Sequence, residues 1–508
     1  MSRIRISLDG VEHEVGDGRD LLSTCLSSGV DVPHFCWHDA LGSVGACRLC
    51  AVRVFKGPDD AAGRIEMACM TPVAPGQRVE SLDPEAAEMR ARVIEWLMVN
   101  HPHDCAVCEE GGACHLQDMT VATGHRTRRY RFEKRTHRNQ YLGPLLTHEM
   151  NRCIACYRCT RFYRQYAGGR DLDVFGAHDN VYFGRAEDGV LESPFAGNLA
   201  EVCPTGVFND KGWSGDYARK WDMAATPSVC SGCSVGCNLF VAERGGRVRR
   251  VQNRYNGAIN GHFLCDKGRY GALHVAAPGQ IAEARVDGGN ATVEAALAAA
   301  RAALSEGAVA LGSPRATLET NFALRRLVGD GNFFAGTGGS EARIVARMAG
   351  LLAEGPAAPA SLRDIETADA AIVLGEDLTA TAPRAALTLR QAARAASLAL
   401  AEEKGVPRWL DNAARVAGEG RLAPIALVTP MPDAQDDIAT WALRRAPAEI
   451  AAFGQAVAAA IRGEAVEAPD AQAVADALRG ADAPAVIAGS GSGLDHIRAP
   501  AAGTGDHG

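Results

Sequence analysis

Sixteen cysteines are the residues of this chain with the clearest capacity for chemistry. All of them lie between Cys25 and Cys265, and residues 266–508 contain none. Most stand in tight C-x2-C groups, a spacing that suits a shared metal better than distant crosslinks. A disulfide framework is typical of small secreted chains, whereas this chain has 508 residues. The cysteines therefore predict metal-cluster sites.

The first predicted site contains the segment CRLC, with one cysteine before it and one after it. Its members are Cys36, Cys47, Cys50 and Cys69. Two irons bridged by two sulfides need four thiolates, which a wrapping loop and one distant strand can supply. We expect Gly42 and Gly45 to let the backbone pass close to the cluster and to turn N–H groups toward the sulfurs. A structural zinc ion is the alternative.

The second predicted site lies in the segment HPHDCAVCEEGGAC. Its members are His101, Cys105, Cys108 and Cys114. His103 competes for the fourth position, and spacing alone leaves that choice open. Either histidine is otherwise a surface or capping residue. By analogy with Rieske centres, a histidine ligand should raise the reduction potential. Gly111-Gly112 would allow a tight wrap before Cys114.

The third and fourth predicted sites have the spacing of cubane clusters. The third site contains Cys153, Cys156, Cys159 and Cys203. Three cysteines at this spacing can hold three corners of a [4Fe–4S] cluster, and Cys203, which precedes a proline, most simply completes it. The fourth site contains Cys230, Cys233, Cys237 and Cys265, with zinc again as the alternative. Its C-x2-C-x3-C-x27-C pattern opens molybdopterin-dependent oxidoreductases.

Cys25 is left over once these four sets are drawn. Sixteen cysteines minus Cys25, plus one histidine, give sixteen ligands, which is four sets of four. Cys25 falls on a predicted helix beside Leu21 and Leu22. We expect it to be a small buried apolar residue.

The elements that would position the first two sites are visible in the residue pattern. Residues 3–15 alternate apolar and polar residues around Asp9-Gly10, which predicts a β-hairpin. A short helix is predicted from Asp20 to Ser28, and a longer one over 84–100, opening with Pro84. Strand, turn, strand and helix ahead of a cysteine loop predict a ferredoxin-like β-grasp domain.

The second half of the chain is rich in alanine and has the pattern of an α/β domain. Strands are predicted at Ala308–Leu311, Ala370–Leu374, Ile425–Val428 and Ala485–Ala488, with a helix from Thr292 to Leu304 before the first. Apolar strands that alternate with helices predict a parallel sheet covered by helices.

Composition narrows the class of protein further. The net charge of -8 gives no general reason to expect nucleic-acid binding. The basic run Arg126–Arg138 is predicted to pack between cluster domains, screen the clusters or contact a partner. No stretch approaches the roughly 18 apolar residues that span a bilayer, and the N-terminus reads as a strand and not as a signal. These features predict a cytoplasmic protein and are compatible with docking on a membrane-embedded partner.

Several segments resemble the iron–sulfur G subunits of bacterial proton-pumping NADH:quinone oxidoreductase (respiratory complex I). They include HPHDCAVCEEGGACHLQDMT, HEMNRCIACYRCTRFYR, GAHDNVYFGR and NRYNGAINGHFLCDKGR. The resemblance is specific up to about residue 275. Beyond that it extends only to the general character of the molybdopterin-oxidoreductase fold.

The resemblance implies one [2Fe–2S] cluster at the first site and [4Fe–4S] clusters at the other three, with His101 as the histidine ligand. It implies electron transfer from a flavin- and NADH-binding subunit toward quinone through further iron–sulfur subunits, coupled to proton translocation by partner subunits. The chain would then be a subunit of an enzyme, with no substrate site of its own. It would sit on the cytoplasmic face of the inner membrane.

The chain ends earlier than the resemblance implies, so we expect either a shortened C-terminal region or an incomplete sequence, and in both cases no molybdenum cofactor. Formate dehydrogenase and iron-only hydrogenase are rivals that carry similar cluster modules. The predicted domains are 1–83 ([2Fe–2S], ferredoxin-like), 84–123 ([4Fe–4S] with one histidine and three cysteine ligands), 124–222 (ferredoxin-like [4Fe–4S]), 223–279 (molybdopterin-oxidoreductase-type [4Fe–4S]) and 280–508 (α/β).

Overall fold

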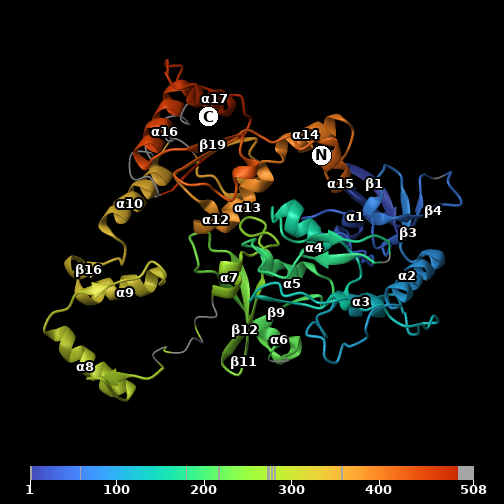
Figure 1. Cartoon of the computed structure of the whole chain (residues 1–508), viewed down its shortest axis with the longest axis horizontal. Helices are drawn as coiled ribbons and strands as arrows, with labels where there is room; N and C mark the ends of the chain where they lie inside the picture. The colour runs from blue at the N-terminus through green and yellow to red at the C-terminus, as the bar shows by residue number, and fades with distance from the viewer. Residues whose placement is uncertain are drawn as a thin grey trace.

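The computed structural model describes residues 3–489 except 58, 179, 216–217, 272–274, 276–278, 280–281 and 356–357. Figure 1 shows the N-terminal sheet, in blue, at one end of a body whose centre is made of short elements. The α/β part, in orange and red, packs along one side of that centre. The four predicted sites all fall in the blue-to-green part of the chain.

The N-terminal part is a five-stranded mixed sheet with strand order β2-β1-β5-β3-β4. Its strands are β1 (Arg3–Leu8), β2 (Val11–Gly16), β3 (Ala51–Phe55), β4 (Arg64–Met67) and β5 (Arg78–Glu80). The predicted hairpin is confirmed, because β1 and β2 pair antiparallel around Asp9-Gly10, both with positive φ. Helix α1 (Leu21–Ser27) contributes Leu21, Leu22 and Cys25 to the core beneath the sheet. Cys25 is fully buried, as expected of a small apolar residue.

Asp20 begins α1, since its carboxylate accepts the Ser23 amide at 2.8 Å. Asp20→Ala is expected to weaken the helix by about 1 kcal/mol, the usual effect of losing an N-cap. Hydrogen exchange of the α1 amides in the intact protein measures this loss as faster exchange. Asp31→Ala, at an exposed carboxylate in the same part of the chain, is the matched control. Equal exchange in both variants would show that the cap contributes nothing.

The middle of the chain consists of short elements that hold loops in place. Helix α2 (Pro84–Leu97) ends three residues before the predicted helix end, and α3 (His115–Ala122) follows the second site. Two small antiparallel pairs come next: β6 (Leu146–His148) with β9 (Phe208–Asp210), and β7 (Asp173–Phe175) with β8 (Tyr182–Gly184). The helical segments here are α4 (Arg158–Thr160), which continues into a π-helix (Arg161–Tyr166), α5 (Leu199–Val202) and α6 (Lys211–Ser214).

A three-stranded antiparallel sheet carries the fourth site. Its strands are β10 (Ala224–Val229), β11 (Asn238–Arg244) and β12 (Arg247–Asn253), and helix α7 (Asp266–Tyr270) follows. Leu239 and Val251 of this sheet pack with Cys237 and Leu264 in a small core of their own.

The C-terminal part is built on a four-stranded parallel sheet with strand order β19-β18-β17-β20. Its strands are β17 (Ala370–Leu374), β18 (Ile425–Thr429), β19 (Trp441–Arg444) and β20 (Pro484–Ala488). Three of these were predicted, and β19 was missed because WALR is short and half exposed. The surrounding helices are α11 (Leu362–Thr367), α12 (Leu378–Thr381), α13 (Pro383–Ala392), α14 (Ala395–Glu403), α15 (Asp411–Ala417), α16 (Pro447–Ile461) and α17 (Pro469–Arg479).

Both faces of this sheet are buried, as the continuous apolar strands predict. Val373 and Leu427 face a core that includes Ala385 and Leu389 of α13. Ile372, on the opposite face of β17, packs with residues of α16 and α17. Strands β17 to β20 therefore form a parallel sheet that is covered by helices on both faces.

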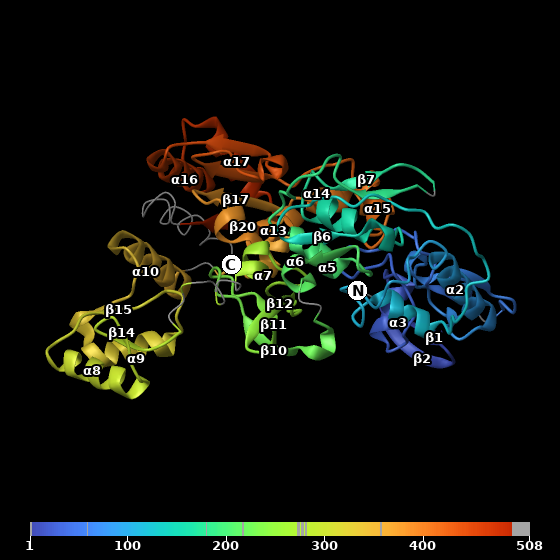
Figure 2. The ribbon, with the colours of Figure 1, turned by 60° about the horizontal axis from the view of Figure 1, so that its bottom comes forward.

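The prediction that Ala308–Leu311 joins this sheet is wrong. The strand there, β15 (Ala310–Leu311), is two residues long and pairs only with β16 (Phe333–Phe334). It belongs to a segment with β13 (Arg285–Val286), β14 (Gly289–Asn290), α8 (Val293–Ser305), α9 (Leu318–Val328) and α10 (Gly339–Glu354). Helices α8 and α9 lie apart from the rest of the ribbon in both views (Figures 1 and 2). A short apolar run cannot encode which sheet it joins, because the same run serves any buried strand.

In the described part of the chain, every helix is too short or too polar to cross a bilayer.

Candidate metal centres

The first site is assembled between α1 and the sheet. Cys36 lies on the loop after α1, Cys47 and Cys50 immediately precede β3, and Cys69 lies on a 3-10 turn after β4. The Cys36 amide donates to the Cys47 sulfur and the Cys69 amide to the Cys50 sulfur, each at 3.4 Å. All four side chains are buried. The structure therefore brings the whole predicted set together.

The glycines of the first-site loop turn the chain, as predicted, with φ near +65° at Gly42 and +67° at Gly45. Their amides do not face the sulfurs, however. The Gly42 amide donates to the His38 carbonyl and the Gly45 amide to the Ser43 hydroxyl. Amides of Cys36 and Cys69 donate to sulfur, so this site does direct N–H groups toward its sulfurs, although not those of the two glycines.

The thiols of the first site strongly perturb one another. Hydrogen bonds with the Cys36 sulfur, together with burial, raise the pKa of Cys47 and of Cys69. Several buried thiols this close cannot all ionise unless a cation compensates them. Without a metal these thiols therefore favour the protonated form. Metal binding reverses this, because a coordinated thiol is deprotonated.

At the second site the structure separates the two histidines. His101 is 8% exposed, and its Nδ1 atom is buried without a hydrogen-bond partner. Burial, with a smaller contribution from His103, lowers the pKa of His101 to about 4, which keeps the ring neutral as a metal ligand requires. His103 is exposed, and its Nε2 lies 3.3 Å from the Met98 sulfur. These contacts favour His101 over His103.

The cysteines of the second site lie on a tight loop that ends at the start of α3. Cys108 and Cys114 are buried, and Cys105 is exposed. A Cβ at Gly111 would lie 2.6 Å from the Cys105 carbonyl oxygen, and one at Gly112 would strike the Trp221 ring. The predicted wrap by Gly111-Gly112 therefore depends on their lack of side chains.

The third site surrounds a small cavity. Its four cysteines line this cavity together with hydrophobic residues such as Ile154, Phe183 and Val207. The loop between the cysteines is strained, since Ala155 has φ of 50° and Tyr157 has φ of 64°. Left-handed conformations are costly for residues other than glycine, and they cluster at functional loops. No sequence signal marked these two positions.

The fourth site surrounds a second small cavity, lined by all four of its cysteines. The Gly232 amide donates to the Cys230 sulfur and the Gly268 amide to the Cys265 sulfur, each at 3.3 Å. A Cβ at Gly268 would lie 3.2 Å from the Cys230 sulfur. Lys267 and Arg384 also line the cavity. The sequence did not single out these two cations, and Arg384 comes from α13, more than a hundred residues along the chain.

The donor set fits clusters of several metal atoms. All sixteen cysteines are free thiols. Burial is the first cause that raises the pKa of Cys114, Cys156 and Cys237 to about 12. Among the described residues, no three His, Cys, Asp or Glu side chains converge on a single ion. At the third and fourth sites the four cysteines surround a space and not a point, which is the arrangement that a polynuclear cluster requires.

The basic run Arg126–Arg138 lies against the second site and α2. Arg129 forms an ion pair with Glu95 at 2.9 Å, Arg128 donates to the Val99 carbonyl at 3.0 Å, and the Lys134 ammonium donates to the His101 carbonyl. Of the three predicted roles, packing between cluster domains is the one that these contacts support, and screening of the clusters and contact with a partner stay predictions.

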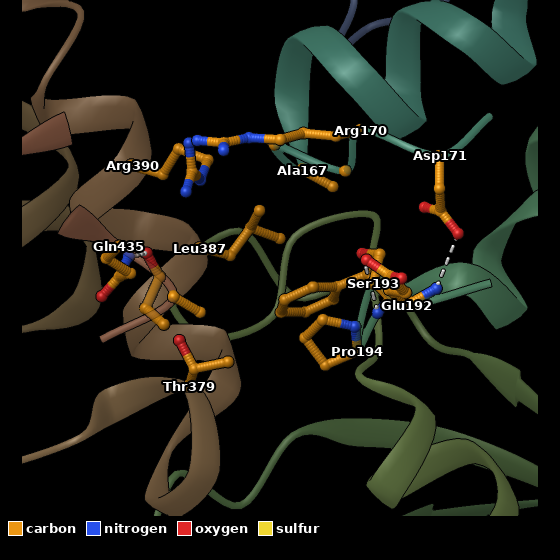
Figure 3. Close-up of a pocket in the computed structure, with 15 residues that line it drawn as sticks. Ala167, Arg170, Asp171, Glu192, Ser193, Pro194, Thr379, Leu387, Arg390 and Gln435 are labelled. Carbon is orange, nitrogen blue, oxygen red and sulfur yellow. Dashed lines mark hydrogen bonds between the residues drawn. The ribbon is translucent and has the colours of Figure 1, made fainter. Parts of the chain in front are cut away.

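A cavity of about 250 Å³ lies between the middle of the chain and the α/β part. Figure 3 shows Leu387 of α13 pointing into it, opposite the Glu192–Pro194 segment, with Arg170 and Arg390 along one edge. Both arginines pair with Asp437. Its lining contains no cysteine or histidine, so it is distinct from the four sites.

Four family models match the cluster-bearing half of the chain. They are a 2Fe-2S iron-sulfur cluster binding domain (1–84), the NADH-ubiquinone oxidoreductase-G iron-sulfur binding region (90–129), the ferredoxin-like domain of NADH-quinone oxidoreductase subunit 3 (143–209) and the molybdopterin oxidoreductase Fe4S4 domain (223–277). Fold and sites together define an iron–sulfur protein with both 2Fe–2S and 4Fe–4S binding domains. The predicted fold class is confirmed.

The relatives identify the family. The chain is 52% identical over 495 residues to the G subunit of NADH-quinone oxidoreductase from Pseudomonas putida, covering 96% of this chain and 55% of that protein. It is 50% identical over 513 residues to the protein of the same name from Escherichia coli K12, covering 98% and 56%. The chain belongs to the family of NADH-quinone oxidoreductase G subunits. It spans about 55% of the length of the curated relatives that it matches.

Among solved structures, an NAD+-reducing [NiFe]-hydrogenase in the H2-reduced state superposes with a TM-score of 0.37 and 30% identity. The match covers 41% of this chain and 87% of that one.

Proposed function

We propose that this chain is the electron-relay subunit of an NADH:quinone oxidoreductase. The first site holds one [2Fe–2S] cluster, and the second, third and fourth sites each hold one [4Fe–4S] cluster. Electrons arrive from a flavin-bearing subunit that oxidises NADH and leave toward quinone through further iron–sulfur subunits, on the cytoplasmic face of the membrane. Proton translocation belongs to the partner subunits. The names of the relatives and the four family models support this role.

The observation that carries the proposal is the central position of the third site, which is linked by packing to each of the other three. It shares a hydrophobic core with the first site, because Cys156 packs in the same cluster of buried side chains as Cys36 and Cys50. It shares another core with the fourth site, where Cys159 and Cys265 pack in one cluster.

The third site meets the second site through the turn after Cys203 and through Arg152, which precedes Cys153. The Cys114 sulfur lies 3.7 Å from the Pro204 carbonyl oxygen, and a Cβ at Gly206 would lie 2.5 Å from the Cys108 sulfur. Buried Arg152 forms ion pairs at 2.8 Å with Asp104 and Glu109, which flank the cysteines of the second site.

These contacts suit electron tunnelling, because they hold neighbouring sites at a fixed separation. The chain sets the reduction potential of each cluster in three ways: by the identity of the ligands, by their burial and by hydrogen bonds to the sulfurs. The iron–sulfur clusters, when bound, supply the one-electron chemistry. No residue of this chain is required to act as a general acid, base or nucleophile.

A reductive titration of the anaerobically purified protein tests the relay. We expect an uptake of about four electrons per chain, one for each cluster. NADH alone should leave the clusters oxidised, whereas NADH with a flavin-bearing NADH dehydrogenase subunit should reduce them. A chain that takes up no electrons from dithionite would refute the proposal. A chain that is reduced by NADH alone would show that it has a nucleotide site of its own.

A further inference from the structure

Two arginines of the third-site segment reach across to the first-site loop. Arg158 and Arg161 flank Cys159 in the segment CYRCTR and are three residues apart. At this helical spacing their side chains project on the same side of the segment. The residues of the first-site loop that they contact lie more than a hundred residues away in sequence.

Arg158 binds the start of the first-site loop. Its Nη1 donates to the carbonyl of Phe35, the residue before Cys36, at 3.4 Å. Its Nε is buried without a hydrogen-bond partner and is therefore available to a sulfur. Burial lowers the pKa of Arg158, while the thiols of Cys156, Cys203, Cys36 and Cys47 act in the opposite direction. Two of these cysteines belong to the third site and two to the first. The Arg158 guanidinium therefore interacts electrostatically with both sites.

Arg161 binds the middle of the same loop. Its guanidinium donates to the Leu41 carbonyl, and to the Gly42 carbonyl at 3.2 Å. The residue is 3% exposed. A Cβ at Gly42 would lie 2.8 Å from the Trp409 carbonyl oxygen, so the loop is also pressed against the α/β part.

The α/β part supplies the counter-charge for Arg161. Asp411, the first residue of α15, accepts from Arg161 at 3.2 Å, from Arg394 at 2.7 Å and from Arg415 at 2.8 Å. Arg415 also donates to the Gln165 carbonyl of the π-helix at 3.0 Å. Burial raises the pKa of Asp411, but Arg415 and Arg394 outweigh it and hold the pKa below its usual value. Asp411 therefore stays ionised and keeps Arg161 oriented.

From these contacts we infer that Arg158 and Arg161 couple the first and third sites, Arg158 through its charge and Arg161 by fixing the first-site loop, with Asp411 as the positioning residue for Arg161. This inference rests on the proposed function, since it concerns clusters held at those two sites. We expect no molybdenum in this chain, and the inference gives its α/β part a different role. Through Asp411, the α/β part holds Arg161 in place and so stabilises the first-site loop.

A buried positive charge beside a cluster raises the midpoint potential of that cluster. A cluster gains negative charge when it accepts an electron, so a nearby buried guanidinium stabilises the reduced form. Salt screens a buried pair weakly. Removal of the Arg158 charge should therefore lower the midpoint potentials of the first and third clusters together, and should leave that of the fourth cluster, beside Lys267 and Arg384, unchanged.

Redox titrations followed by EPR on the full cluster-loaded chain test this. In Arg158→Met we expect the ratio of reduced to oxidised cluster at a fixed potential to fall about tenfold for both clusters, equivalent to about 59 mV for a one-electron couple. Arg158→Lys keeps the charge and should keep both midpoints near wild type. Arg158→Gln is a second neutral variant in case the methionine variant does not assemble. Arg164→Met is the matched control, since Arg164 lies on the same segment but is half exposed and pairs with Asp173.

The outcomes separate the inference from the proposed function. Normal EPR signals with unmoved midpoints in both neutral variants would overturn the role of Arg158 while the relay stands. Equal shifts in Arg164→Met would show that the effect is general and not specific to Arg158. A wild-type protein without cluster signals would overturn the proposed function itself.

The positioning role of Asp411 has its own readout. In Asp411→Asn we expect faster hydrogen exchange at Leu41 and Gly42 and a broadened EPR line of the first cluster, with iron content unchanged. Asp411→Glu should restore both, because it returns the charge. Unchanged exchange at the loop in Asp411→Asn would contradict the positioning role.

Discussion

In Cys153→Ala, the EPR signal of the third cluster is expected to disappear and electron transfer through the chain to stop. The third site is linked by packing to each of the other three sites, so its loss removes the central step of the proposed relay. Loss of residues that merely support a metal ligand already costs roughly 10- to 100-fold in affinity or activity, and loss of the ligand should cost at least ~100-fold. NADH-to-quinone turnover of the assembled complex and low-temperature EPR measure the two effects.

Cys25→Ala is the matched control for this variant. Cys25 is fully buried, like most of the ligand cysteines, but it belongs to none of the four sites. It should keep all cluster signals and full turnover, with at most a small loss of stability from the missing sulfur. Unchanged turnover in Cys153→Ala would remove the third site from the electron path.

In His101→Cys, the midpoint potential of the second cluster is expected to fall by on the order of 100 mV. The reason is charge: a thiolate in place of a neutral imidazole makes the cluster more anionic and disfavours the added electron. The buried, unpartnered Nδ1 of His101 is the structural basis for choosing this histidine. A redox titration of the second EPR signal measures the shift.

His103→Ala is the control, and it decides between the two histidines. His103 is exposed and contacts the Met98 sulfur, so its removal should leave the second cluster's potential unchanged. A shift in His103→Ala, with none in His101→Cys, would reverse the assignment.

Much of the site was predictable because ligand spacing is a local property. The C-x2-C groups and the glycines beside them define loops that wrap a cluster, and the structure brings the third and fourth sets around their cavities as expected. The hairpin and α1 were predictable for the same reason: Asp9-Gly10 and Asp20 act within a few residues of their own position.

The contacts between sites were not predictable, because they join residues far apart in sequence. Nothing in the segment CYRCTR indicates that Arg161 will meet Asp411, 250 residues later. The choice between His101 and His103 depends on burial, which spacing does not encode. The prediction that Ala308–Leu311 joins the main sheet failed for a similar reason, since a short apolar run does not specify its partner strand.

Iron and sulfide content, measured together with EPR on protein purified without oxygen, is the most direct test of the central claim. One [2Fe–2S] and three [4Fe–4S] clusters predict about fourteen irons per chain, matching sulfide, and four signals on dithionite reduction. Zinc in place of iron at these cysteines, with no signal on reduction, would contradict the account.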